Sequence, residues 1–175
     1  MGYDGFTPRQ HQRHGLDICI NALERRFIIS ACTGSGKNKL IQMVAQYYSN
    51  VLLITDRVSV VDQLMQEREN FGLMYDIMTT QKAIRNVKLL GNYDIVLIDE
   101  CHAMFTSVLK FIKDNDIKLI GFTATATRRA LLIYYNKIYS IATFNNMVKD
   151  GYLVEPTFYS TCLLYTSPSP RDVEE

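Results

Sequence analysis

Short apolar runs rich in β-branched residues alternate along this chain with longer segments of helical periodicity. The apolar runs predict strands at 27–30, 51–55, 75–78, 95–98 and 118–123. Apolar residues at three- and four-residue spacing predict helices at 37–48, 58–70, 81–89 and 103–113. Alternation of this kind is typical of an α/β fold with a mostly parallel sheet and helices on both faces. Such a sheet binds ligands beyond the carboxyl ends of its strands, so we expect the chemistry in the loops there.

Length, charge and cysteine spacing narrow the class of protein. The 175 residues, 47% of them hydrophobic, are enough for about one domain with a sizeable core. The net charge is +1, so nucleic-acid binding would depend on local residues and not on a strong overall field. The four cysteines form no C-x-x-C pair, which argues against a zinc site or a disulfide framework and fits a reducing compartment. The apolar runs fall far short of the roughly 20 residues that span a bilayer, and we expect a cytoplasmic protein.

The last segment is expected to lie outside the fold. Residues 162–172 resemble the translation of a transposon-end sequencing-library adapter, so we interpret 162–175 as a cloning or assembly scar that is not native. A genuine Ser/Pro-rich linker is the alternative. On the first interpretation, the authentic protein continues beyond Thr161.

A glycine-rich loop follows the first predicted strand and precedes a helical segment. It reads Ala31-Cys32-Thr33-Gly34-Ser35-Gly36-Lys37-Asn38. Gly34 and Gly36 let the backbone curl so that successive N–H groups face an anion, while Lys37 can reach the outer phosphates. The usual pattern, G-x-x-x-x-G-K-[ST], ends in a hydroxyl that binds Mg²⁺, for which the amide oxygen of Asn38 is an imperfect substitute. The loop predicts a nucleotide-phosphate site, with a ligand-free glycine turn as the alternative.

Two carboxylates, Asp99 and Glu100, follow the apolar run 95–98 at the ligand edge of the predicted sheet. A magnesium-bound triphosphate needs one carboxylate to hold the metal and a second group to polarise the attacking water. We assign Asp99, together with Asn38, to the metal and Glu100 to the water. An Asp-Glu pair alone is more often a helix N-terminus, but it gains weight downstream of a phosphate loop.

Three segments together resemble motifs I, II and III of the superfamily 2 helicases. They are Thr33-Gly34-Ser35-Gly36-Lys37, Asp99-Glu100-Cys101-His102 and Thr123-Ala124-Thr125. The D-E-C-H form is most similar to the branch that holds type III restriction subunits and bacterial or phage DNA-repair helicases. The resemblance covers roughly residues 6–160. It implies a RecA-like P-loop NTPase domain, ATP and Mg²⁺ as cofactors, catalytic roles for Lys37, Asp99 and Glu100, and a bacterial, archaeal or phage-infected cell.

The resemblance also implies roles for residues around these motifs. Gln12, in Arg9-Gln10-His11-Gln12, would read the adenine edge, and the alternative is an ordinary solvated helix start. His11 itself is expected to be a surface residue. The residues that would couple the ATP site to a second motor domain are His102, Thr123 and Thr125, although each also fits an ordinary helix start or strand. The residues that match nucleic-acid-contacting motifs of the family are Arg57, Gln63, Thr80 and Gln81.

These motifs predict the N-terminal motor domain of an ATP-dependent nucleic-acid helicase or translocase, with DNA favoured over RNA. Residues 1–152 would form this domain, and 153–161 the start of a linker to a second RecA-like domain that the chain lacks. Because that second domain supplies the arginine finger in the family, the chain alone is expected to hydrolyse ATP slowly. Two other functions stay open. Asn38 favours a catalytically weak nucleotide-binding module, and the neutral charge favours a P-loop kinase or ATPase that does not act on nucleic acid.

Overall fold

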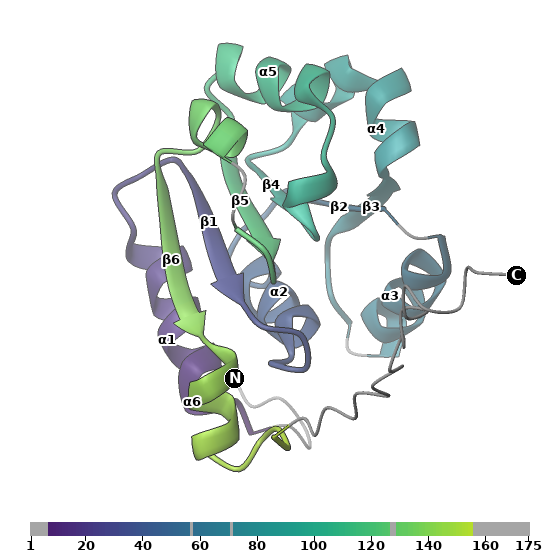
Figure 1. The fold of residues 1–175 in the computed structure, drawn as a ribbon. Coiled ribbons are helices and arrows are strands. Elements are labelled where there is room, and N and C mark those ends of the chain that lie inside the picture. Colours follow the sequence, from purple (N-terminus) through teal and green to yellow (C-terminus); the bar gives the residue numbers. More distant parts are fainter. Residues whose placement is uncertain (1–6, 57, 71, 127–128, 156–175) are drawn as a thin grey trace, which may run out of the picture.

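The computed structural model describes residues 7–56, 58–70, 72–126 and 129–155 (Figure 1). Six parallel strands form one sheet in the order β3-β2-β4-β5-β1-β6. The strands are β1 (Arg26–Ala31), β2 (Val51–Thr55), β3 (Asp76–Thr79), β4 (Ile95–Ile98), β5 (Lys118–Thr123) and β6 (Lys137–Ala142). The α-helices are α1 (Gln10–Asn21), α2 (Lys37–Ala45), α3 (Val58–Asn70), α4 (Thr80–Arg85), α5 (Thr106–Asp114) and α6 (Phe144–Lys149). None of the described helices is both long and apolar enough to cross a membrane.

Side chains alternate across the strands and form a hydrophobic cluster on each face of the sheet. Phe27 and Ile29 of β1 belong to one cluster, which α1, α2 and α3 cover (Figure 1). Ile28 faces the other cluster, which α4 and α5 cover. Every residue of the inner strands β2 and β4 is buried, as expected for a parallel sheet between two layers of helices. The predicted α/β fold class is therefore confirmed.

The five predicted strands are all present, with bounds within one residue of those predicted. β6 and α6 were not predicted, and α1 was foreseen only as the helix start that is the alternative for Gln12. β6 lies at the edge of the sheet and is largely half-exposed, so it lacks the continuous apolar run that marked the other strands. Ile138 and Ser140 point to one face of the strand, and Tyr139 and Ile141 point to the other. The β-branched and aromatic residues among these four are the signal that could have predicted the strand.

Three predicted helices are wrong in extent. α2 ends at Ala45 and not at residue 48, and 81–89 consists of α4 followed by a 3-10 helix over Val87–Asn92. The segment predicted at 103–113 contains α5, which begins only at Thr106. It starts late because Glu100 is left-handed, Cys101–Ala103 is a short 3-10 helix, and the next two residues are extended. Of the predicted linker 153–161, residues up to 155 are described, and the predicted scar 162–175 lies outside the described residues.

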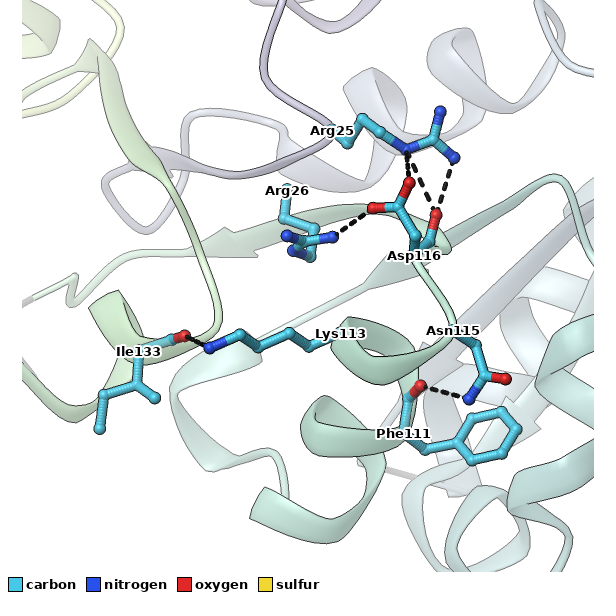
Figure 2. A network of polar contacts seen from close by, with 7 residues as sticks. All are labelled: Arg25, Arg26, Phe111, Lys113, Asn115, Asp116 and Ile133. Atoms are coloured by element: carbon cyan, nitrogen blue, oxygen red, sulfur yellow. Dashed lines mark hydrogen bonds and ion pairs between the residues drawn. The ribbon is translucent and has the colours of Figure 1, made fainter.

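Asp116 joins β1 to β5 at the amino-terminal edge of the sheet, opposite the ligand edge (Figure 2). Its backbone oxygen accepts hydrogen bonds from Arg25 Nε at 3.2 Å and Nη2 at 2.8 Å. Its carboxylate pairs with Arg25 Nε at 3.1 Å and with Arg26 Nη1 at 2.8 Å. Arg25 and Asp116 are exposed, so each pair contributes about 0–1 kcal/mol. These contacts help to hold the register in which Arg26 lies beside Leu119, and therefore the relative height of the loops at the other edge.

Candidate nucleotide-binding site

The strand order brings three predicted motifs to one edge of the sheet. β5 lies between β1 and β4, so the loops that follow these three parallel strands are neighbours. They border a cleft of about 520 Å³. The cleft lining includes the predicted residues Thr33, Asn38, Asp99, Glu100, His102 and Thr125. It also includes Thr55, the last residue of β2, and Asp56, which follows it.

The loop between β1 and α2 has the backbone that a phosphate cradle needs. Gly34 and Gly36 have φ of 80° and 81°, values that residues with a Cβ rarely adopt. A Cβ at Gly36 would also lie 2.5 Å from Gln12 Nε2. α2 begins at Lys37, directly after Gly36, so the unpaired N–H groups and the positive end of the helix dipole lie at the loop. The local geometry fits the binding of an anion.

Lys37 and Glu100 face each other across the strand ends. Lys37 Nζ donates a hydrogen bond to the Ala31 oxygen at 3.3 Å and lies 3.8 Å from Glu100 Oε1. The Lys37 side chain is 9% exposed and that of Glu100 38%, so the lysine is shielded while the carboxylate is open to the cleft. The two motifs predicted to act on one nucleotide are therefore in contact.

A second set of contacts joins Glu100 to the end of β5. His102 Nδ1 lies 3.3 Å from Glu100 Oε2 and 2.8 Å from Thr123 Oγ1. The Thr123 hydroxyl is 3.5 Å from the same carboxylate oxygen, and it accepts a hydrogen bond from the Thr125 backbone N–H at 3.0 Å. The side chain of Thr123 is thus buried within a polar network, which distinguishes it from an ordinary β-branched strand residue. The structure brings together the three residues predicted to couple the site.

Asp99 and Asn38 line the same cleft and could both contribute oxygen ligands to Mg²⁺. Asp99 Oδ1 accepts the Glu100 backbone N–H at 3.0 Å, which orients this carboxylate at the strand end. Among the described residues, no group of three or more His, Cys, Asp or Glu side chains could hold a metal by itself. The donor set fits Mg²⁺, which commonly takes one or two protein oxygens and completes its shell with phosphates and water.

Gln12 lies behind the phosphate loop and not in open solvent. It is 2% exposed, and its Nε2 donates to the oxygens of Ser35 at 3.3 Å and Gly36 at 3.1 Å. Its Oε1 accepts the Arg9 backbone N–H at 2.9 Å. The role predicted for Gln12 as a reader of adenine stays a prediction, because both ends of its amide contact the protein in this structure.

His11 was expected at the surface, but it contacts the phosphate loop. It is half-buried, and its Nε2 lies 2.8 Å from the Ser35 oxygen. Arg9 reaches the same loop, with Nη1 3.4 Å from the Gly34 oxygen. From the sequence, Arg9 was named only as part of the segment Arg9-Gln10-His11-Gln12, and neither Arg9 nor His11 was given a role at the phosphate loop. Arg9 is the N-cap of α1, and His11 lies in its first turn.

The residues predicted to contact nucleic acid lie in different environments. Arg57 is outside the described residues, and Gln63 lies on α3. Gln81 is exposed at the start of α4. Thr80 is 3% exposed, and its hydroxyl donates to the Thr55 oxygen at 3.4 Å. The buried Thr80 hydroxyl thus ties α4 to the end of β2. The nucleic-acid contact predicted for this segment stays a prediction.

The core directly beneath Glu100 holds a close contact that the sequence did not reveal. A Cβ at Gly121 on β5 would lie 2.7 Å from Cys101 Sγ and 2.9 Å from Tyr135 Oη. Burial raises the pKa of the Cys101 thiol to about 12, so the thiol is neutral and unreactive near neutral pH. Cys101 therefore packs as a small apolar side chain that anchors the segment carrying Glu100.

Comparisons with known proteins bear on the family and the fold. The family model of the type III restriction enzyme, res subunit, matches residues 5–86. No curated protein sequence matches the chain.

Among solved structures, the UvsW helicase from bacteriophage T4 is similar, with a TM-score of 0.67 and 14% identity over 80% of this chain and 62% of that chain. A second structure of T4 UvsW gives a TM-score of 0.68 and 14% identity over 79% of this chain and 35% of that chain. The Hef helicase domain from Pyrococcus furiosus gives a TM-score of 0.64 and 19% identity over 82% of this chain and 39% of that chain. The chain spans less than two thirds of each. At these identities the likeness shows a shared fold.

Proposed function

We propose that this chain is the N-terminal RecA-like domain, and so the ATP-binding half, of an ATP-dependent superfamily 2 helicase or translocase. The match of residues 5–86 to the res-subunit family model and the fold shared with the UvsW and Hef helicase structures support the proposal. The chain binds ATP with Mg²⁺ in the cleft at the ends of β1, β5 and β4, and a nucleic-acid strand is its track. DNA is favoured over RNA, since the family model that matches is that of a restriction enzyme.

The contact between Lys37 and Glu100 carries this proposal. It joins the phosphate loop to the acidic segment at 3.8 Å, across a strand that lies between them in the sheet. A ligand-free glycine turn would not require a shielded lysine to point at a carboxylate on another loop. A triphosphate does, because its terminal phosphate needs a cation on one side and a group that orients the attacking water on the other.

Each residue of the site then has a distinct task. Lys37 leaves Glu100 and binds the outer phosphate oxygens, while the backbone N–H groups of residues 34–37 bind the inner ones. Glu100 accepts a hydrogen bond from the attacking water and takes up its proton. Mg²⁺, held by Asp99 and the amide oxygen of Asn38, would neutralise charge on the phosphate oxygens.

His102 and Thr123 connect the position of the Glu100 carboxylate to the end of β5. Both lie within 3.5 Å of Glu100 Oε2, so movement of the carboxylate toward a bound nucleotide changes their contacts. The backbone N–H of Thr125 donates a hydrogen bond to the Thr123 hydroxyl, and Thr125 also lines the cleft. We infer that a second motor domain packs beyond this loop, supplies the arginine finger and senses the change.

Nucleic-acid-stimulated ATP turnover tests the proposal. The reading frame at the source locus is sequenced past Thr161, the longer protein is purified, and turnover is measured with single-stranded DNA, with RNA and without nucleic acid. Stimulation by DNA above that by RNA is expected. Turnover that neither nucleic acid changes would instead support a P-loop ATPase with another role.

Asn38 favours a second candidate, a nucleotide-binding module with little catalysis. Asn38 lines the cleft at the position from which a hydroxyl normally binds Mg²⁺. The substitution Asn38→Thr in the longer protein separates the two functions. Turnover that rises with Asn38→Thr indicates a motor with a weakened metal site, and turnover that stays absent indicates a binding module.

A further inference from the structure

Three consecutive carbonyl groups of the phosphate loop are held from behind by side chains at the start of α1. Arg9 Nη1 lies 3.4 Å from the Gly34 oxygen, and His11 Nε2 lies 2.8 Å from the Ser35 oxygen. Gln12 Nε2 lies 3.3 Å from the Ser35 oxygen and 3.1 Å from that of Gly36. Each of these side-chain nitrogens donates to a loop oxygen. The Gly36 oxygen also accepts the backbone N–H groups of Lys39 and Leu40 in the first turn of α2, at 3.1 Å and 3.3 Å.

The direction of these carbonyls decides whether the loop can bind an anion. In each peptide unit the C=O and N–H groups point in opposite directions. Ser35 and Gly36 carbonyls that are fixed on the α1 side therefore turn the N–H groups of Gly36 and Lys37 toward the cleft, where a phosphate would be. The Ser35 N–H donates to the Cys32 oxygen at 3.2 Å and closes the turn of the loop. A loop whose carbonyls turned inward would repel the same phosphate.

Tyr152, which follows α6 and is far from α1 in sequence, supports two of the three side chains. The Arg9 guanidinium carbon lies 4.5 Å from the centre of the Tyr152 ring, which is a cation–π arrangement. The His11 ring meets the same ring edge-on, with 6.0 Å between ring centres. The next residue also touches the loop, because a Cβ at Gly34 would lie 3.0 Å from Leu153 Cδ2.

The end of α6 fixes the place of Tyr152. Gly151 has φ of 74°, and the N–H groups of Tyr152 and Leu153 both donate to the Met147 oxygen, at 2.9 Å and 3.1 Å. Met147 itself is 1% exposed and packs with Ala31 and Ala142, at the carboxyl ends of β1 and β6. The ring is therefore held on the same framework as the loop that it supports.

We propose that Tyr152 is a positioning residue for the phosphate loop, acting through Arg9 and His11. It does not touch the nucleotide. Its ring keeps the two cationic or polar side chains extended against the loop carbonyls, so that the loop is ready to bind phosphate before nucleotide arrives. The inference rests on the proposed function, because it assumes that the loop binds the phosphates of ATP.

Inorganic tripolyphosphate and ATP together test this role in the 175-residue chain. With Mg²⁺ present, Tyr152→Ala is expected to weaken binding of both probes by the same factor, about two- to fivefold, as for an exposed cation–π contact. Tyr152→Phe keeps the ring and should bind both probes like wild type. Tyr47→Ala removes a tyrosine that is 59% exposed beyond the far end of α2, and it serves as the matched control.

Backbone amide exchange without nucleotide gives a second readout. The Ser35 N–H, which donates to the Cys32 oxygen at 3.2 Å, should exchange faster in Tyr152→Ala than in wild type, Tyr152→Phe or Tyr47→Ala. The melting temperature shows that each variant is folded. Loss of affinity for ATP alone would mean that the ring contacts the base, and it would overturn the inference. Unchanged affinity and exchange in Tyr152→Ala would overturn it as well. If wild type binds neither probe, the proposed function fails. Amide exchange in the loop then decides by itself whether Tyr152 positions the loop.

Discussion

Glu100 combines an unusual backbone with a central chemical role. Its φ is 49°, a left-handed conformation that costs a non-glycine residue of order 1 kcal/mol or more. Strain of this kind persists where the surrounding structure over-determines it, and here Asp99 and the buried Cys101 flank the residue. We take the strained backbone at Glu100 as support for its assignment to the attacking water.

Replacing Glu100 by Gln separates binding from hydrolysis. In the longer protein, Glu100→Gln should lower ATP turnover by about 10²–10⁴, because the amide cannot take up a proton from water. Affinity for Mg·ATP should stay the same or rise, since Lys37 loses a competing carboxylate at 3.8 Å. Turnover is measured beside Glu69→Gln, an exposed carboxylate on α3. Equal losses in both variants would remove Glu100 from the mechanism.

The cysteines differ in their expected reactivity. Burial raises the pKa of the Cys19 and Cys101 thiols to about 12, so near neutral pH almost none of either thiol is in the reactive thiolate form. Burial also raises the pKa of Cys32, but this residue lies in the phosphate loop and is partly exposed.

We therefore expect a thiol reagent to modify Cys32 first in a Cys162→Ser background, which removes the cysteine outside the described residues. Mg·ATP should slow this modification, and Cys19 and Cys101 should react only on unfolding. Mass spectrometry of the modified peptides follows each site. Early labelling of Cys101 would show that the core beneath Glu100 is open.

At the scale of elements, the contact between β5 and the acidic segment controls where Glu100 lies. Gly121→Ala places a Cβ 2.7 Å from Cys101 Sγ and 2.9 Å from Cys101 Cβ, so one of the two segments must move. We expect a loss of about 1–3 kcal/mol in the free energy of unfolding, as for overpacked cores. Chemical denaturation measures it beside Gly91→Ala, which would meet no atom within 4 Å. A loss equal to that of Gly91→Ala would contradict the packing described.

Some elements and contacts could be predicted from the sequence and others could not. The strands β2, β4 and β5 were predictable because burial on both faces leaves continuous apolar runs. The place of the phosphate loop and the acidic segment at one edge of the sheet followed from the rule that parallel strands bind ligands at their carboxyl ends. The contact of Lys37 with Glu100 was found only in the structure. Tyr152 was not predictable as a support of the loop, because its partners Arg9 and His11 lie at the start of α1, about 140 residues earlier in the chain, and no local pattern links the two segments.

In the whole molecule that we propose, the described residues form the first of two motor domains. The arginine finger of a second domain is worth about 10³–10⁵ in rate where it has been removed from related NTPases. The 175-residue chain should therefore bind Mg·ATP but turn it over more slowly than the longer protein by a factor of that order. Phosphate release from both proteins at saturating ATP measures this. Equal rates would show that the first domain is catalytically complete.

Calorimetric titration of Mg·ATP into the 175-residue chain tests whether the phosphate loop, with Lys37, binds the nucleotide. Lys37→Ala removes the ammonium group that lies between the loop and Glu100, and Lys39→Ala is the matched control, because Lys39 pairs with Glu67 at 3.3 Å on another face of α2. We expect one Mg·ATP site in wild type and in Lys39→Ala. In Lys37→Ala the affinity for Mg·ATP should fall at least about tenfold, as for a lost charge-assisted contact. Absence of binding in wild type, or equal binding in all three proteins, would contradict this expectation.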